Sequence, residues 1–134
     1  MEAESPAGPR KETILVVDDD DPVRAFVGDA LAAEGYTILA TADPLEARRI
    51  VTSRAVDLLL TDVVMPRMNG LELAEHVEVA SSATKVLLMS GYMTALMKAS
   101  GRPILTKPFT VDALLRAVRG VLRGHSAFRR SEPR

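Results

Sequence analysis

The chain has 134 residues, with 17 Lys and Arg against 18 Asp and Glu and a formal net charge of −1. This balance argues against a protein built as a whole to bind nucleic acid or an anionic membrane surface. Hydrophobic residues make up 47% and charged residues 26%, which is typical of one globular domain, and the absence of cysteine excludes disulfides and thiolate metal sites.

The first twelve residues are acidic and rich in proline and alanine. They lack the apolar stretch of a signal peptide, so we expect a disordered tail over 1–12. No apolar run in the sequence approaches the length needed to cross a bilayer. A cytoplasmic protein is therefore the default expectation.

From residue 13 onward, strand patterns alternate with helix patterns. Short apolar runs predict strands at 13–18, 36–41, 58–61, 84–89 and 103–105. Helical spacing of apolar residues predicts helices after Pro22, after Pro44, over 71–79, over 92–99 and after Thr110. Alternation of this kind implies βαβ units, and right-handed connections favour a doubly wound α/β fold. We expect a five-stranded parallel sheet in the order 2-1-3-4-5.

Cap signals mark several of the helix starts. Asp21 and Asp43 each precede a proline, which is typical of an N-cap followed by the first helical position. Thr110 is the predicted cap of the last helix. The single histidine within the helix over 71–79, His76, has no second histidine nearby and is expected at the surface.

Four acidic residues, Asp18 to Asp21, directly follow the first predicted strand. Like charges gathered at a strand end repel one another, and a hard cation such as Mg²⁺ would relieve that repulsion. A solvated turn with a helix cap is the simpler reading of an acidic run. The other strand ends decide between these two readings.

Chemistry-bearing residues also follow three other predicted strands, namely Asp62, Ser90 and Lys107. The carboxyl ends of parallel strands share one edge of the sheet, so these residues are expected to converge with Asp18 and Asp19. Phosphoryl transfer to a carboxylate suits this set. Asp62 would be the nucleophile, a Mg²⁺ ion would neutralise the acids, and Lys107 and Ser90 would bind phosphoryl oxygens.

Four stretches carry a family resemblance: Leu-Val-Val-Asp-Asp-Asp (15–20), Thr-Asp-Val-Val-Met-Pro-Arg-Met-Asn-Gly (61–70), Val-Leu-Leu-Met-Ser-Gly-Tyr (86–92) and Thr-Lys-Pro-Phe (106–109). They resemble the receiver domain of two-component response regulators, which has the CheY-like fold. The resemblance covers residues 13–123. The wording around Ser90 is closest to receivers associated with hybrid histidine kinases.

The resemblance implies a role for each matching residue. Asp62 is implied as the phospho-acceptor and as a Mg²⁺ ligand. Asp19 is implied as a direct Mg²⁺ ligand, Asp18 as one acting largely through water, and the backbone carbonyl of Val64 as a further ligand. Asp20 and Asp21 match no catalytic position.

The resemblance also implies roles around the phosphoryl group. Lys107 would bind the phosphate, and the Ser90 hydroxyl would move toward it as a switch. Pro108 matches a position where the family has a cis peptide bond, which would help to aim Lys107 inward.

The sequence departs from the family pattern on the side of the predicted fifth strand. Ile104 stands where receivers commonly carry Tyr or Phe, so the usual aromatic switch is in doubt. Tyr92 either takes over the role of the missing aromatic residue or is an aromatic residue at the surface. The stretch from Ser90 to Lys107 is short, so we expect a shortened or irregular fourth helix. The usual receiver dimer is doubtful for the same reason, and we expect a monomer or weak dimer.

Residues 124–134 form a basic tail that we expect to be solvated, with no DNA-binding domain. Its positive charge comes from arginines, of which Arg123 lies just before the tail and three lie within it: Arg129, Arg130 and Arg134. We expect a stand-alone receiver that takes phosphate from a histidine kinase or a histidine phosphotransfer protein and acts on a downstream protein target.

Three alternatives stay open. The chain is either a stand-alone receiver or a receiver segment of a hybrid kinase. A pseudo-receiver that works without phosphorylation is a further possibility, favoured only by Ile104. An aspartyl-phosphate phosphatase is disfavoured, because Val64 stands where that class needs a general acid. We do not expect an enzyme.

Overall fold

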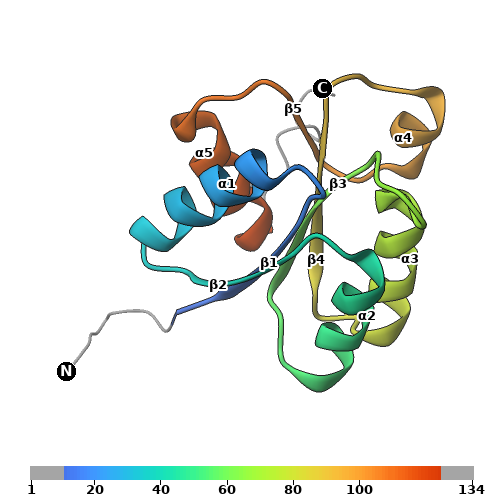
Figure 1. Cartoon of the computed structure of the whole chain (residues 1–134), viewed down its shortest axis with the longest axis horizontal. Coiled ribbons are helices and arrows are strands. Elements are labelled where there is room, and N and C mark those ends of the chain that lie inside the picture. Colours follow the sequence, from blue (N-terminus) through green and yellow to red (C-terminus); the bar gives the residue numbers. More distant parts are fainter. Residues whose placement is uncertain (1–10, 125–134) are drawn as a thin grey trace.

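Five parallel strands form the centre of the fold in the computed structural model, which describes residues 11–124 (Figure 1). The strands are β1 (Thr13–Val17), β2 (Thr37–Thr41), β3 (Leu58–Asp62), β4 (Lys85–Ser90) and β5 (Ile104–Thr106). Their order in the sheet is β2-β1-β3-β4-β5. Both the parallel pairing and this order confirm the predicted doubly wound sheet.

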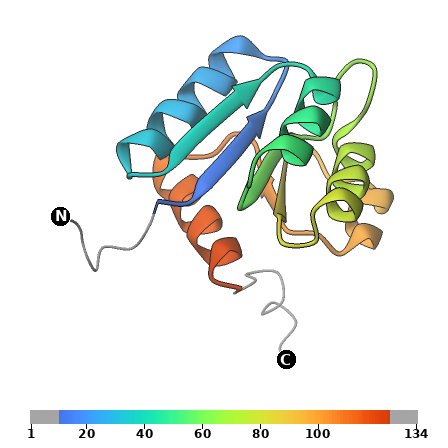
Figure 2. The same cartoon turned by 90° about the horizontal axis from the view of Figure 1, so that it is seen from below.

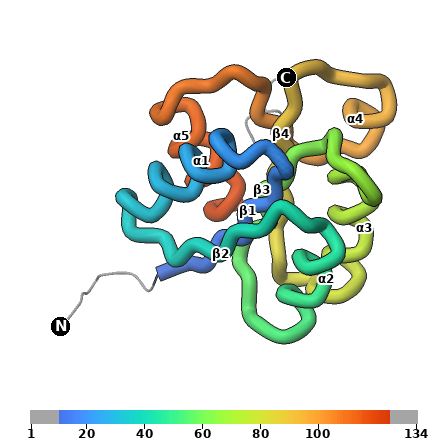
Figure 3. The backbone as a smooth tube through the Cα atoms, in the orientation of Figure 1, coloured from blue at the N-terminus to red at the C-terminus, as the bar shows by residue number. Residues whose placement is uncertain are grey.

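Helices cover both faces of the sheet. They are α1 (Asp21–Ala33), α2 (Pro44–Ser53), α3 (Gly70–Ala80), α4 (Ala95–Ser100) and α5 (Val111–Leu122). Figures 1 and 2 show α1 and α5 on one face and α2, α3 and α4 on the other. The tube in Figure 3 shows α1 beside α5 and α2 beside α3, and these pairs are in contact.

The core is divided by the sheet into two apolar layers. Ile14, Val16, Leu58 and Leu60 point toward α1 and α5. Leu15, Val17, Leu59 and Leu88 point toward α2, α3 and α4. Side chains in a strand alternate between faces, so a strand buried on both faces has to be apolar throughout. This is why the central strands have continuous apolar runs.

The N-cap of the first helix lies one residue earlier in the chain than predicted. Asp20 is the N-cap of α1, and its side chain accepts a hydrogen bond from the Val23 backbone N–H. The assignment of the cap to Asp21 is therefore wrong. Asp21 is already helical, and Pro22 occupies the second helical position, which proline also tolerates because the first N–H groups of a helix have no internal partner.

The other two predicted caps are confirmed. The Asp43 side chain accepts from the Leu45 N–H, and the Thr110 hydroxyl accepts from the Ala113 N–H.

The shortened fourth helix is confirmed, with only six residues in α4. Thr94 caps its start and Gly101, with φ of 72°, ends it in the left-handed conformation. Asp62 and Ser90 are the last residues of β3 and β4, not the first residues after them. The expectation that they follow their strands is corrected by one residue.

The expected N-terminal tail lies mostly outside the described residues. So do the basic residues Arg129, Arg130 and Arg134 of the expected C-terminal tail. Within residues 11–124, no helix is both long and apolar enough to cross a bilayer.

Candidate functional site

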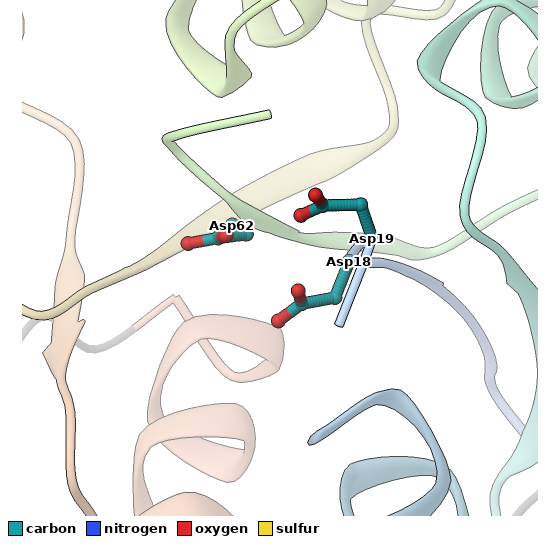
Figure 4. Close-up of side chains that lie close together, drawn as sticks. All are labelled: Asp18, Asp19 and Asp62. Atoms are coloured by element: carbon teal, nitrogen blue, oxygen red, sulfur yellow. The ribbon is translucent and has the colours of Figure 1, made fainter. Parts of the chain in front are cut away.

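Three carboxylates gather at the carboxyl edge of the sheet (Figure 4). Asp18 and Asp19 come from the turn after β1, and Asp62 ends the neighbouring strand β3. One oxygen from each lies within 4.8 Å of the others. Asp18 and Asp62 are buried, whereas Asp19 is exposed. The predicted convergence of these three residues is therefore confirmed.

Lys107 lies directly beside two of these acids. Its Nζ is 3.2 Å from Asp18 Oδ2 and 3.4 Å from Asp62 Oδ1. The backbone of Lys107 is fixed by the sheet, because its N–H donates to the Ser90 carbonyl at 2.7 Å. The peptide bond between Lys107 and Pro108 is cis, as the resemblance implied.

Backbone groups hold the two buried carboxylates in place. Asp18 Oδ1 accepts from the Asp20 N–H at 3.0 Å, and the Asp18 N–H donates to the Thr41 carbonyl at 3.3 Å. Asp62 Oδ1 accepts from the Val63 N–H at 3.0 Å. One lysine and a few backbone donors therefore offset the charge of the two buried acids.

The balance of charge still leaves Asp62 hard to ionise. Its burial, followed by the negative charge of Asp18, raises the pKa of the Asp62 carboxyl, and Lys107 only partly opposes this. Burial alone would lower the pKa of Lys107, but the charges of Asp18 and Asp62 outweigh it and raise that pKa overall. A further cation beside Asp62 would favour its charged form.

The acids fit the ligand set of Mg²⁺. That ion prefers carboxylate and other hard oxygen ligands, and oxygens around it stand about 3.0 Å apart when adjacent and about 4.2 Å apart when opposite. Oxygens of the three acids all lie within 4.8 Å of one another, so small side-chain movements would bring them onto one ion. Val64 lies two residues after Asp62, and its side chain is exposed.

Ser90 lies at the end of β4, beside β3, but its hydroxyl is engaged within its own loop. Ser90 Oγ donates to the Tyr92 carbonyl at 2.5 Å and accepts from the Tyr92 N–H at 3.2 Å. The Tyr92 ring is exposed at the surface. Ile104 is half-buried and packs against the core. Because its hydrogen bond goes to the Tyr92 carbonyl, the Ser90 hydroxyl must rotate before it can donate to another acceptor.

The loop after β3 is anchored closely to Asp62. The Gly70 N–H donates to the Val63 carbonyl at 2.8 Å. A Cβ atom at Gly70 would stand 2.3 Å from the Asp62 carbonyl oxygen, so only glycine fits there. The start of α3 thus packs directly against the backbone of Asp62.

Arg24 is a contact residue of this site that the sequence prediction missed. Its Nη1 donates to the Asp18 carbonyl at 2.8 Å and its Nη2 to Asp21 Oδ1 at 2.7 Å. A cation in the first turn of a helix opposes the helix dipole. An arginine at that position, just after an acidic run, was the available signal.

His76 is exposed on α3, as predicted.

Comparison with known proteins places this site in context. The sequence model of the response regulator receiver domain matches residues 14–119. The chain is similar to Response regulator MprA of Mycobacterium ulcerans, with 34% identity over 82% of the chain and 50% of that protein. It thus spans about half the length of the MprA relatives that it matches. It is also similar to Sporulation initiation phosphotransferase F of Bacillus subtilis, with 32% identity over 83% of the chain and 94% of that protein.

Solved structures show the same architecture. Chemotaxis protein CheY4 of Vibrio cholerae superposes with a TM-score of 0.79 at 28% identity, over 84% of the chain and 99% of that structure. The receiver domain of the hybrid histidine kinase CckA gives 0.72 at 34% identity, over 82% and 98%. Response regulator TrrA of Thermotoga maritima, in complex with Mg²⁺-BeF, gives 0.74 at 29% identity, over 82% and 98%.

Proposed function

Because this chain belongs to the response regulator receiver domain family and has its CheY-like fold, we propose that Asp62 accepts a phosphoryl group in a two-component phosphorelay. The donor is a phosphohistidine on a histidine kinase or a histidine phosphotransfer protein. The acylphosphate on Asp62 then changes the surface that this chain offers to a downstream protein target.

The observation that carries this proposal is the grouping of Asp18, Asp19 and Asp62 beside Lys107. In the transfer, a bond forms between an Asp62 carboxylate oxygen and phosphorus, and the bond from phosphorus to the histidine nitrogen breaks. The imidazole leaves with the bonding electron pair. Lys107 then holds an oxygen of the phosphoryl group as a point charge.

Mg²⁺ is the proposed cofactor. Asp18, Asp19, Asp62 and the backbone carbonyl of Val64 would hold it, with Asp18 acting largely through water. When bound, the ion neutralises negative charge on the acids and on the phosphoryl oxygens. The raised pKa of Asp62 supports this assignment, because a cation there would favour the charged, nucleophilic carboxylate.

Ser90 is the proposed switch. Its hydroxyl gives up the Tyr92 carbonyl and donates to a phosphoryl oxygen, and this moves the loop after β4. Because Ile104 replaces the usual aromatic residue, the movement has to be transmitted by the loop and by the short helix α4.

Phosphorylation with a small donor tests the proposal. The full chain is incubated with MgCl₂ and acetyl phosphate, and its intact mass is measured. We expect one added phosphoryl group, lost on treatment with hydroxylamine and missing in Asp62→Asn. The matched control Asp112→Asn, an exposed acid on α5, keeps the adduct. An unmodified wild type, or an adduct that survives Asp62→Asn, would overturn the proposal.

A stand-alone cytoplasmic receiver is the form that we propose. It is supported by the relative from Bacillus subtilis, 94% of which is covered by this chain. The similarity to the CckA receiver supports a segment of a hybrid kinase instead. The size of the native protein on an immunoblot of its own cells separates them, because a hybrid kinase is several times larger.

We further propose that the chain is a phospho-acceptor and not an enzyme with an external substrate. A phosphatase that works through an aspartyl phosphate needs an acid two residues after the nucleophile, and Val64 occupies that position. Steady turnover of unrelated phosphomonoesters, dependent on Asp62, would contradict this part of the proposal.

A further inference from the structure

Arg24 joins the first helix to the backbone of the acidic turn. Its guanidinium makes two contacts through different nitrogens: one to the Asp18 carbonyl at 2.8 Å and one to Asp21 Oδ1 at 2.7 Å. The side chain is only 22% exposed, although its acidic partner Asp21 lies out in solvent. The contact with the Asp18 carbonyl is therefore the sheltered one.

The peptide group that Arg24 holds is the one that joins Asp18 to Asp19. A peptide group is planar, so fixing its carbonyl also fixes the direction of the N–H and Cα of the next residue. Asp18 has other restraints, since its two carboxylate oxygens accept from the Asp20 N–H and from Lys107. The contact from Arg24 adds one restraint that passes directly to Asp19.

Asp19 depends more than its neighbours on that backbone restraint. Among residues 11–124, no side-chain hydrogen bond or ion pair of Asp19 is found, and the side chain is exposed. Its carboxylate still lies within 4.8 Å of oxygens from Asp18 and Asp62. The orientation of its main chain is therefore what keeps this carboxylate with the other two.

From these contacts we propose that Arg24 is a positioning residue for divalent cation binding, which acts on Asp19 through the Asp18 carbonyl. This inference rests on the metal site of the proposed function. Removal of Arg24 would change the Mg²⁺ affinity in opposite directions, depending on whether Arg24 acts mainly through its charge or mainly through the position of Asp19. A guanidinium near the site repels a cation, so removing it would tighten binding if charge were its main effect. Removing it weakens binding if its main effect is on position.

Mg²⁺ affinity of the full chain, without any phosphodonor, tests the inference. Isothermal titration with MgCl₂ is carried out on the wild type, Arg24→Ala and Arg24→Lys. Loss of a group that orients a metal ligand typically raises Kd by about tenfold or more, and we expect this for Arg24→Ala. Arg24→Lys, which keeps a donor and the charge, is expected to recover part of the affinity.

Arg116→Ala is the matched control. Arg116 forms an ion pair with Asp112 on α5 that is more exposed than the pair of Arg24 with Asp21. Among residues 11–124, no hydrogen bond or ion pair joins Arg116 to the acidic turn. We expect its Mg²⁺ Kd to equal that of the wild type. Asp21→Ala removes only the outer partner of Arg24 and is expected to have a small effect beside that of Arg24→Ala. The Asp19 amide resonance of the metal-free protein is expected to shift in Arg24→Ala and not in Arg116→Ala.

The outcomes are separable. Unchanged or tighter binding in Arg24→Ala would overturn this inference and leave the proposed function intact, whereas a wild type that binds no Mg²⁺ would count against the metal site itself. If Arg24→Ala does not fold, as judged by its melting curve, Arg24→Met decides, because methionine keeps the apolar stem and removes the donors to the Asp18 carbonyl. Unchanged or tighter Mg²⁺ binding in Arg24→Met would then overturn the positioning role.

Discussion

Asp62 illustrates how the demands of the site oppose stability at the scale of one residue. Its carboxyl is buried next to Asp18, and both the burial and that neighbouring charge raise its pKa. An acid whose pKa is raised on folding binds its proton more tightly in the native state than in the unfolded state. Above its ordinary pKa of 3.8, the native state therefore loses stability as the pH rises through the raised value.

This sign leads to a prediction for the metal-free protein. In EDTA, Asp62→Asn should be more stable than the wild type at pH 7, because the amide removes the buried charge while it keeps the shape. The difference should disappear as the pH falls toward the ordinary pKa of the carboxyl. Chemical denaturation at several pH values measures it. Asp112→Asn, an exposed control, should show no such gain.

Two glycines predict opposite responses to the same substitution. Gly70→Ala would place a Cβ 2.3 Å from the Asp62 carbonyl oxygen, and relieving this clash should cost about 2–3 kcal/mol. Gly28→Ala, within α1, meets only the Ile38 side chain at 3.7 Å and should gain up to about 1 kcal/mol from helix propensity. Urea unfolding of both variants checks the pair, and equal effects would contradict the close approach.

At the scale of the element, α4 is held by few contacts. It has six residues, of which only Met97 is buried. Just after it, Arg102 forms a two-point ion pair with Glu78 of α3, with Nε to Oε2 at 3.0 Å and Nη2 to Oε1 at 2.7 Å. This pair ties the segment between α4 and β5 to the nearest long helix.

Breaking that pair should loosen α4 specifically. The Arg102 side chain is only 16% exposed, so Arg102→Ala should cost about 1 kcal/mol and speed amide exchange across α4. Arg102→Lys should not restore protection fully, because lysine cannot make the paired contact. The Arg116 and Asp112 side chains are 66% and 77% exposed, so Arg116→Ala should cost less than about 0.5 kcal/mol. Unchanged exchange in α4 of Arg102→Ala would contradict the role of the pair.

At the scale of the whole molecule, the fold was largely predictable because alternation of strand and helix patterns leaves few parallel arrangements. The convergence of Asp18, Asp19, Asp62 and Lys107 followed from that topology. The contact of Arg24 with a backbone carbonyl did not, because no residue pattern specifies which carbonyl a long side chain reaches. The cap of α1 was misassigned for a local reason: either of two adjacent aspartates before a proline satisfies the sequence signal.

The whole molecule should also respond to the metal. A ligand that binds only the native state at 100 times its Kd stabilises the protein by about 2.7 kcal/mol. We therefore expect MgCl₂ to raise the melting temperature and EDTA to reverse the rise. Asp19→Asn should lose the effect, because Asp19 is one of the three clustered acids. Asp112→Asn should keep it, and an identical response in the two variants would place the ion elsewhere.

The distribution of the site along the chain has a consequence for biosynthesis. The three acids belong to the turn after β1 and the end of β3, whereas Lys107 follows β5. A ribosome makes the acids first, but a domain generally folds as a unit. The three carboxylates are therefore brought together only after β5 and Lys107 have left the ribosome. We expect a nascent chain that ends before Lys107 to leave these acids apart and hydrated, so that their mutual repulsion arises only when the lysine is present.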